Sequence, residues 1–123
     1  MYIAARKVQK ERVLSSFVEA GSVSAALLTE KGSIYVGVCI DTACSLGLCA
    51  ERNAIANMIT NDENSICRLI AVDRNGKAIP PCGACRSFMT QLIPENYRLI
   101  EIMLDYEKEK VATLGELTSK WWI

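Results

Sequence analysis

The segment "RLIEIMLDYEKEKVATL", residues 98–114, decides between the sheet topologies that are open to this chain. Two strand-like runs, "RLIEIML" (98–104) and "VATL" (111–114), are separated only by the polar stretch "DYEKEK" (105–110). A connection that returns the chain for a parallel pairing needs about a dozen residues or more. We therefore expect these last two strands to pair antiparallel.

Three further strands are expected on the N-terminal side of this segment. "GSVSAALL" (21–28) and "SIYVGVCI" (33–40) flank "TEKG", and this pattern predicts a β-hairpin with Gly32 in its turn. The apolar run "CRLIAVDR" (67–74) predicts a buried strand. Together with the last two strands, these segments predict a five-stranded mixed sheet.

Helical segments are expected between and around these strands. The stretch from Tyr2 to Val18 has apolar and charged residues at roughly helical spacing, and segments 49–59 and 82–93 also suit helices. Thr113 and Glu116 form a capping-box pattern at the start of a last helix. Strands and helices in this order predict an α/β fold with helices on both faces of the sheet.

Length and charge narrow the class of function. The 123 residues suffice for one domain spanning 1–123, and 14 basic residues balance 14 acidic ones. Proteins that grip a nucleic-acid backbone normally carry a basic excess, so we expect a small-molecule substrate and no nucleic-acid partner. The N-terminus lacks a signal-peptide pattern and no apolar run approaches the length of a membrane span. We therefore expect a cytoplasmic protein with no membrane partner.

The chain contains six cysteines and no histidine. Cytoplasmic thiols stay reduced, so these residues are expected as metal ligands, reactive groups or core residues rather than disulfides. Cys49, Cys82 and Cys85 fall at the first turns of the predicted helices 49–59 and 82–93, where unpaired N–H groups and the helix dipole favour thiolates. If these helices start side by side, three thiolates can hold Zn²⁺ and leave one tetrahedral position open, as in a catalytic zinc site.

Three charged residues near these cysteines are candidates for supporting roles. Glu51 follows Cys49 closely and is placed to move protons at the metal site. Alternatively, Glu51 is an exposed carboxylate without a catalytic role, stabilised by the positive end of the helix dipole. Three thiolates leave a zinc site negatively charged, which weakens the metal as a Lewis acid. Arg52 and Arg86 are placed to draw electron density from the sulfurs and restore this activity.

Two other readings of the cysteines stay open at the level of sequence. Cys44 has a spacing that would let it join the three cysteines above in a structural zinc site with four cysteine ligands. The "CGAC" motif has the form of a redox dithiol, although a thiol oxidoreductase would leave Cys49 unused. Cys39, Cys44 and Cys67 are otherwise expected as small buried apolar residues.

Two motifs, "CAER" (49–52) and "PCGACR" (81–86), resemble the zinc signature of the homotetrameric cytidine deaminases and the related blasticidin S deaminases. "SAALLTEKGSIYVGV" before them and "TLGEL" after them extend the resemblance over most of the chain. The resemblance implies a three-layer αβα sandwich and a homotetramer. It also implies a zinc-dependent hydrolase of pyrimidine salvage, which deaminates the cytosine of cytidine, deoxycytidine or an analogue to uracil and releases ammonia.

The same resemblance implies roles for individual residues. Cys49, Cys82 and Cys85 are the implied zinc ligands, and Glu51 is the implied proton shuttle. The backbone N–H of Ala50 is implied to lie near the carbonyl group of the substrate.

The chain departs from the family pattern just before the zinc motif. Cys39 and Asp41 stand where an Asn-x-Glu pair usually holds the ribose, so both are candidate substrate-binding residues. Asp41 can still accept a hydrogen bond from a sugar hydroxyl, but Cys39 is a poor substitute for an amide. A blasticidin S-type deaminase, or a deaminase of another nucleobase, therefore stays open as an alternative. Trp121 and Trp122 are expected either to close over a ligand or to pack on the sheet or at a subunit contact.

Overall fold

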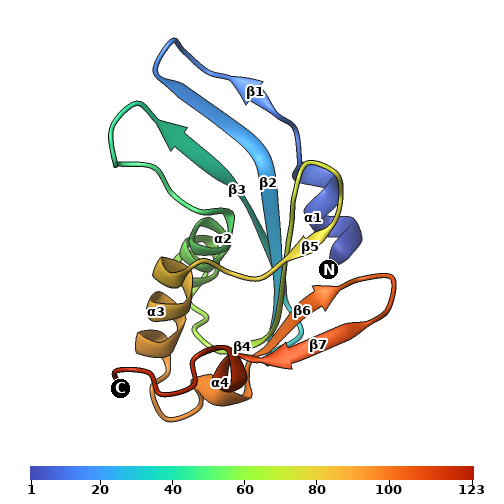
Figure 1. The fold of residues 1–123 in the computed structure, drawn as a ribbon, viewed down its shortest axis with the longest axis vertical. Coiled ribbons are helices and arrows are strands. Elements are labelled where there is room, and N and C mark those ends of the chain that lie inside the picture. The colour runs from blue at the N-terminus through green and yellow to red at the C-terminus, as the bar shows by residue number, and fades with distance from the viewer.

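A computed structural model describes all residues from 1 to 123, which form a mixed seven-stranded sheet with helices on both faces (Figure 1). The strands are β1 (Arg12–Val13), β2 (Val18–Thr29), β3 (Ile34–Thr42), β4 (Ile66–Val72), β5 (Ala78–Ile79), β6 (Glu101–Asp105) and β7 (Lys110–Thr113). The helices are α1 (Tyr2–Val8), α2 (Ala50–Thr60), α3 (Gly83–Leu92) and α4 (Leu114–Leu117), with a 3₁₀ turn, η1, at Tyr97–Leu99. None of these helices combines the length and the apolar character that a membrane span needs.

The five longer strands lie side by side in the order β3, β2, β4, β6 and β7. β2 pairs antiparallel with β3 and β4, whereas β4 runs parallel to β6. β6 pairs antiparallel with β7, with Ile102 opposite Ala112, so the pairing expected for the last two strands is confirmed. The strand count exceeds the expected five because the short strands β1 and β5 pair with the ends of β2 and β4.

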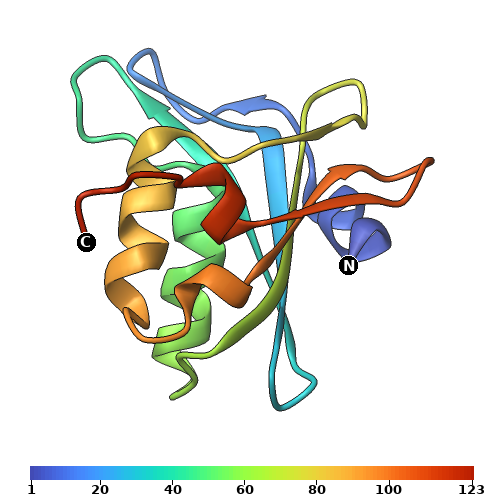
Figure 2. The same ribbon diagram turned by 60° about the horizontal axis from the view of Figure 1, so that its bottom comes forward.

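Helices enclose the sheet from both sides, which confirms the expected three-layer α/β arrangement (Figures 1 and 2). α2 and α3 cover one face, where the side chains of Leu27, Ile55 and Met89 belong to the larger apolar core. α1 covers the other face, where Ala5 and Ala26 belong to a second, smaller cluster. Ala26 and Leu27 are neighbours on β2 and serve opposite faces, because side chains alternate along a strand.

The N-terminal helix is shorter than expected. The helix predicted from Tyr2 to Val18 ends at Val8, and the prediction was wrong beyond that point. Gln9 is extended (φ −69°, ψ 111°), and its side-chain amide donates to the backbone carbonyls of Ser22 and Asp73 at 2.8 and 2.7 Å. These tertiary hydrogen bonds draw the chain out of the helix and into strand pairing with β2.

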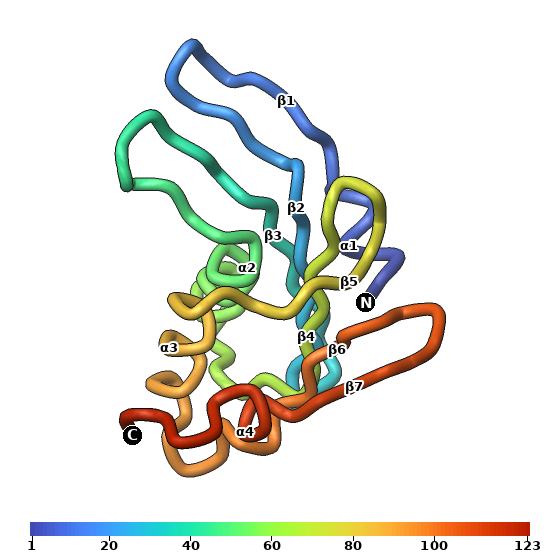
Figure 3. The backbone as a smooth tube through the Cα atoms, in the orientation of Figure 1, coloured from blue at the N-terminus to red at the C-terminus, as the bar shows by residue number.

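The segment after α1 forms a hairpin, β1–β2, that extends beyond the core beside the loop between β3 and α2 (Figure 3). The N–H of Ala43 in this loop donates to the carbonyl of Phe17 in the hairpin at 3.0 Å. Gly21 has a positive φ of 86°, and a Cβ at this position would lie 1.9 Å from the carbonyl oxygen of Lys10. The hairpin therefore requires glycine at this position.

The C-terminal elements agree with the sequence in kind but not in every boundary. The strand expected from residue 98 begins at Glu101, because Tyr97–Leu99 form the turn η1 and bury the ring of Tyr97. The expected capping box is present: the Thr113 hydroxyl accepts from the N–H of Glu116, whose carboxylate accepts from the N–H of Thr113. This box fixes the start of α4.

Candidate metal centre

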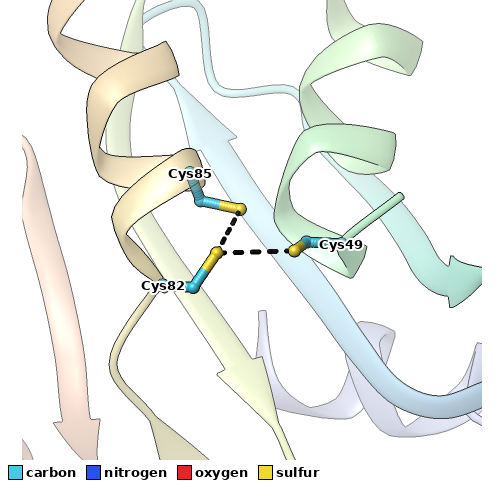
Figure 4. Close-up of side chains that lie close together, drawn as sticks. All are labelled: Cys49, Cys82 and Cys85. Carbon is cyan, nitrogen blue, oxygen red and sulfur yellow. Dashed lines mark hydrogen bonds between the residues drawn. The ribbon is translucent and has the colours of Figure 1, made fainter. Parts of the chain in front are cut away.

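The candidate metal centre lies where α2 and α3 begin next to each other (Figure 4). Each helix starts at a cysteine with extended backbone: Cys49 precedes α2 (φ −68°, ψ 151°) and Cys82 precedes α3 (φ −69°, ψ 169°). Cys85 lies in the first turn of α3 and is fully buried. The fold thus brings together the three cysteines that the sequence singled out, although their sequence positions are far apart.

The three sulfurs are spaced as a tetrahedral zinc ion requires. Sγ of Cys82 lies 3.5 Å from Sγ of Cys49 and 3.6 Å from Sγ of Cys85, and all three lie within 4.8 Å of one another. Zn–S bonds of about 2.3 Å at tetrahedral angles place ligand sulfurs about 3.8 Å apart. The site therefore fits Zn²⁺ with three protein ligands and one remaining coordination position.

The thiols of Cys82 and Cys85 lie in different electrostatic environments. Burial acts to raise the pKa of Cys82, but hydrogen bonds from the backbone of Cys85 and from neighbouring thiols outweigh it and lower that pKa. Burial, together with the negative charges of Glu51 and Cys49, raises the pKa of Cys85 well above its ordinary range. A divalent cation between these groups would remove the repulsion and favour all three thiolates.

Glu51 lies inside the protein, in the first turn of α2, with only 5% of its surface exposed. Burial raises the pKa of its carboxyl group, while its own backbone N–H and the charge of Arg52 act in the opposite direction. A carboxyl group with a raised pKa is better matched to proton exchange near neutral pH. The reading of Glu51 as an exposed helix carboxylate was therefore wrong.

The two candidate arginines have different partners. Nη2 of Arg52 donates to Sγ of Cys49 at 3.5 Å, and this hydrogen bond is the main reason that the pKa of Arg52 is raised. Arg86 instead donates to backbone carbonyls, those of Pro81 at 2.7 Å and Leu117 at 2.9 Å. The expectation that Arg86 acts on the sulfurs directly finds no contact to support it.

A cavity of about 510 Å³ opens beside the sulfurs. Pockets for small-molecule ligands typically have volumes of about 300–1,000 Å³, so a nucleoside-sized ligand fits this one. The residues expected at the site that line the cavity are Cys39, Asp41, Cys49, Ala50, Glu51, Arg52 and Cys82, whereas Cys85 and Arg86 do not line it.

Cys39 is held in the cavity wall by residues that the sequence reasoning missed. Its Sγ accepts the N–H of Val23 at 3.3 Å and lies 3.3 Å from Oγ of Ser22 and 3.7 Å from Oδ2 of Asp41. Ser22 and Val23 line the cavity from β2, whose pairing with β3 is irregular at this point. The sequence feature that could have indicated this irregularity is Gly21, because a glycine inside a strand pattern suggests a bulge.

The fold and site match a known family of enzymes. A family model described as the cytidine and deoxycytidylate deaminase zinc-binding region matches residues 3–99. The chain belongs to this family. The metal that this site fits is Zn²⁺, since the matched family model describes a zinc-binding region and the three sulfurs are spaced for the ion.

Curated relatives and solved structures are similar to this chain over different lengths. A cytidine deaminase of Halalkalibacterium halodurans is 37% identical over 79 residues, 63% of this chain and 59% of the relative. A blasticidin-S deaminase of Bacillus cereus is 30% identical over 89 residues, 65% of this chain and 64% of the relative. The matches thus span about six tenths of these relatives. The crystal structure of cytidine deaminase from Mycobacterium leprae is 24% identical, covers 98% of this chain and 95% of its own, and has a TM-score of 0.79, which supports the fold.

The remaining cysteines and the terminal tryptophans lie outside the group of three sulfurs. The group contains only three cysteines, and Cys44 is not among them, so the structure does not form a four-cysteine site. Cys44 and Cys67 are exposed, and the expectation that both are buried was wrong, because one lies in the β3–α2 loop and the other near the start of β4. Trp121 and Trp122 do not line the cavity.

Proposed function

We propose that this deaminase removes the amino group from the cytosine ring of an unphosphorylated nucleoside or nucleoside analogue, which yields the uracil form and ammonia. The observation that carries the proposal is that three cysteine sulfurs lie within 4.8 Å of one another beside a cavity that Cys49, Cys82 and the buried Glu51 line. Hydrolytic deamination of cytosine needs an activated water and a group that moves protons to the ring and to the leaving amine. The proposed site supplies both.

Glu51 is the proposed catalytic residue. Cys49, Cys82 and Cys85 would hold Zn²⁺, which when bound would supply an activated water molecule as the nucleophile. Glu51 would accept a proton from this nucleophile and deliver it to ring N3. It would then take up the proton of the hydroxyl group added to the ring and pass it to the departing amine. Burial raises the pKa of Glu51, which brings its carboxyl group closer to the range suited to general acid–base catalysis.

Ala50 and Arg52 have proposed supporting roles. Ala50 is the first residue of α2, where backbone N–H groups have no partner within the helix and the helix dipole is positive. Its N–H is therefore suited to donate to the carbonyl oxygen of the ring. The hydrogen bond from Arg52 to Cys49 draws electron density from that sulfur and so strengthens the metal as a Lewis acid.

Cys39 and Asp41 form the part of the wall that we assign to the group attached to the base. Asp41 offers carboxylate oxygens to hydroxyl or amino donors, whereas the sulfur of Cys39 already accepts the N–H of Val23. The cavity is lined by a single cationic residue, Arg52, and its guanidinium is engaged with Cys49. No free cation thus faces a phosphate group, which favours an unphosphorylated substrate.

A blasticidin S-type substrate is the second candidate. Cys39 replaces the amide that holds ribose in typical cytidine deaminases, and the chain is 30% identical to a blasticidin-S deaminase over the matched segment. The replacement at Cys39 favours a substituent other than an ordinary ribose, and the identity shows a resemblance to this class of deaminase as well.

Ammonia release tests the proposal. The panel comprises cytidine, deoxycytidine, their 5′-monophosphates, methylated cytosines, guanine-type bases and blasticidin S, each with zinc-loaded protein. We expect release from an unphosphorylated cytosine compound and little from its monophosphate. Glu51→Gln has nearly the same shape and should lower kcat by at least about 10²-fold, as expected for loss of a general acid–base group. Full activity in this variant would remove Glu51 from the mechanism and with it the proposal.

We further propose that residues 1–123 act as one domain and that the protein works in the cytoplasm as a homotetramer. These statements rest on the sequence pattern and on the family resemblance. Light scattering coupled to size-exclusion chromatography checks the assembly, and a monomer at micromolar concentration would exclude the tetramer.

A further inference from the structure

We propose that Arg86 is a positioning residue, which ties helix α4 to the segment that leads into Cys82 and thereby fixes the Cys82 sulfur for metal binding. The inference rests on the proposed zinc-ligand role of Cys82. It goes beyond that role because it assigns a task in the metal site to α4, an element that does not line the cavity.

The guanidinium of Arg86 joins two backbone segments that are far apart in the sequence. Its Nε donates to the carbonyl of Pro81 at 2.7 Å, and its Nη1 donates to the carbonyl of Leu117 at 2.9 Å. Pro81 immediately precedes Cys82, whereas Leu117 is the last residue of α4. One side chain therefore connects the end of α4 to the peptide group next to a proposed zinc ligand.

The segment that leads into Cys82 has few hydrogen-bond donors of its own, although the side chain of Pro81 is buried. Pro80 and Pro81 have no N–H group to donate, and Cys82 begins α3 without a side-chain capping bond. Pro80 also lines the cavity. A hydrogen bond to the Pro81 carbonyl therefore restrains both the cavity wall and the backbone that carries the Cys82 sulfur.

Helix α4 is a firm point of attachment. Leu114 is fully buried and its N–H donates to the carbonyl of Ile100 at 2.7 Å, while the capping box holds the helix start. The buried hydroxyl of Thr118 donates to the carbonyl of Leu114 at 2.7 Å and closes the other end. The carbonyl of Leu117 is thus held in place from both directions along the chain.

The geometry at Arg86 requires an arginine. A guanidinium is planar and presents its donors as a rigid fork, so one side chain can serve two carbonyls in fixed directions. A lysine keeps the charge but presents a single flexible ammonium. Arg86→Lys therefore removes the bridge while it leaves the net charge and the neighbouring cysteines unchanged.

Zinc release to an excess of a coloured chelator tests the inference in the zinc-loaded protein. We expect Arg86→Lys to release zinc about 10- to 100-fold faster than wild type, the range seen when groups that orient metal ligands are lost. In the cobalt-loaded protein, the sulfur-to-cobalt and d–d absorption bands should shift, and kcat should fall with little change in KM. Arg68→Lys is the matched control, because Arg68 donates through two nitrogens to Glu101 and lies outside the site.

A second variant keeps the test decisive if Arg86→Lys does not fold. Thr118→Val removes the hydroxyl that closes α4 with almost no change of shape, and we expect faster zinc release in the same direction. The inference would be overturned if every variant that folds releases zinc at the wild-type rate and has the wild-type cobalt spectrum. This holds even if the thermal stability of the variant falls. Failure of the proposed function can be distinguished from failure of this inference. If the proposed function is wrong, the wild-type protein releases no ammonia from any compound of the panel.

Discussion

The carboxyl group of Glu51 is subject to two opposing demands. Burial favours its neutral form, whereas the proposed proton transfers also require a carboxylate. The folded state therefore holds this proton more tightly than the unfolded state does. Because folding raises the pKa of this acid, its contribution to stability becomes less favourable as the pH rises through the range above its ordinary value of 4.5.

We expect Glu51→Gln to stabilise the metal-free protein relative to metal-free wild type, with a gain that grows as the pH rises from about 4 to 7. Each unit of pKa elevation corresponds to about 1.4 kcal/mol of unfolding free energy. Urea unfolding over this pH range measures the difference. The exposed Glu107→Gln is the control and should show no such trend. Parallel pH profiles for Glu51→Gln and wild type would contradict the expectation.

Some residues of the site could be predicted from sequence and others could not. Cys49, Cys82 and Cys85 could be predicted because the start of a helix is a local property, which composition and spacing reveal. The partners of Cys39 and Arg86 were not. They depend on an irregularity in β2 and on the position of α4, which no local pattern specifies. Roles assigned to the site residues stay predictions until the variants are measured.

At the scale of elements, the β1–β2 hairpin shows how tertiary contacts override a local pattern. The apolar residues at helical spacing between Tyr2 and Val18 favoured one helix, yet side-chain hydrogen bonds from Gln9 end it early. By contrast, α2 and α3 begin within one residue of the predicted helix starts at Cys49 and Cys82. α4 begins directly after Thr113, as predicted, because the capping box satisfies backbone N–H groups at its start.

Two glycines with the same backbone conformation allow the hairpin to be tested. Gly21 and Gly32 both have a φ of 86°, but a Cβ would meet the Lys10 carbonyl at Gly21 and nothing within 4 Å at Gly32. Gly32→Ala should cost about 1–2 kcal/mol, the strain of the left-handed region alone. Gly21→Ala should cost clearly more, because the hairpin must also move. Equal losses in chemical unfolding would show that the close approach to Lys10 does not constrain the fold.

At the scale of the whole molecule, the zinc centre joins two helices that share one face of the sheet. The apolar core beneath them is formed by side chains such as Leu27, Leu69 and Ile102 and does not depend on the metal. β6 pairs in parallel with β4, and the turn η1 just before β6 contacts α3. The metal should therefore add to stability without being required for the fold.

Removal of zinc should lower the thermal midpoint and leave the secondary structure intact. A ligand present at about 100 times its dissociation constant stabilises the folded state by about 2.7 kcal/mol, so we expect a decrease of several degrees. Calorimetry with and without a chelator measures this shift, and far-UV circular dichroism monitors the helices and strands. Cys82→Ser should show no chelator effect, whereas the exposed Cys67→Ser should respond like wild type. A midpoint unaffected by chelation would exclude a bound stabilising ion.

The sulfurs of Cys49 and Cys82 are separated by 33 positions along the chain, and β4 lies between them. During synthesis the first thiol leaves the ribosome well before the second, and their tetrahedral arrangement exists only after β4 has inserted beside β2. The complete set of three ligands is accordingly available only late in maturation, so occupancy of the centre reports that α2 and α3 have both docked on the sheet.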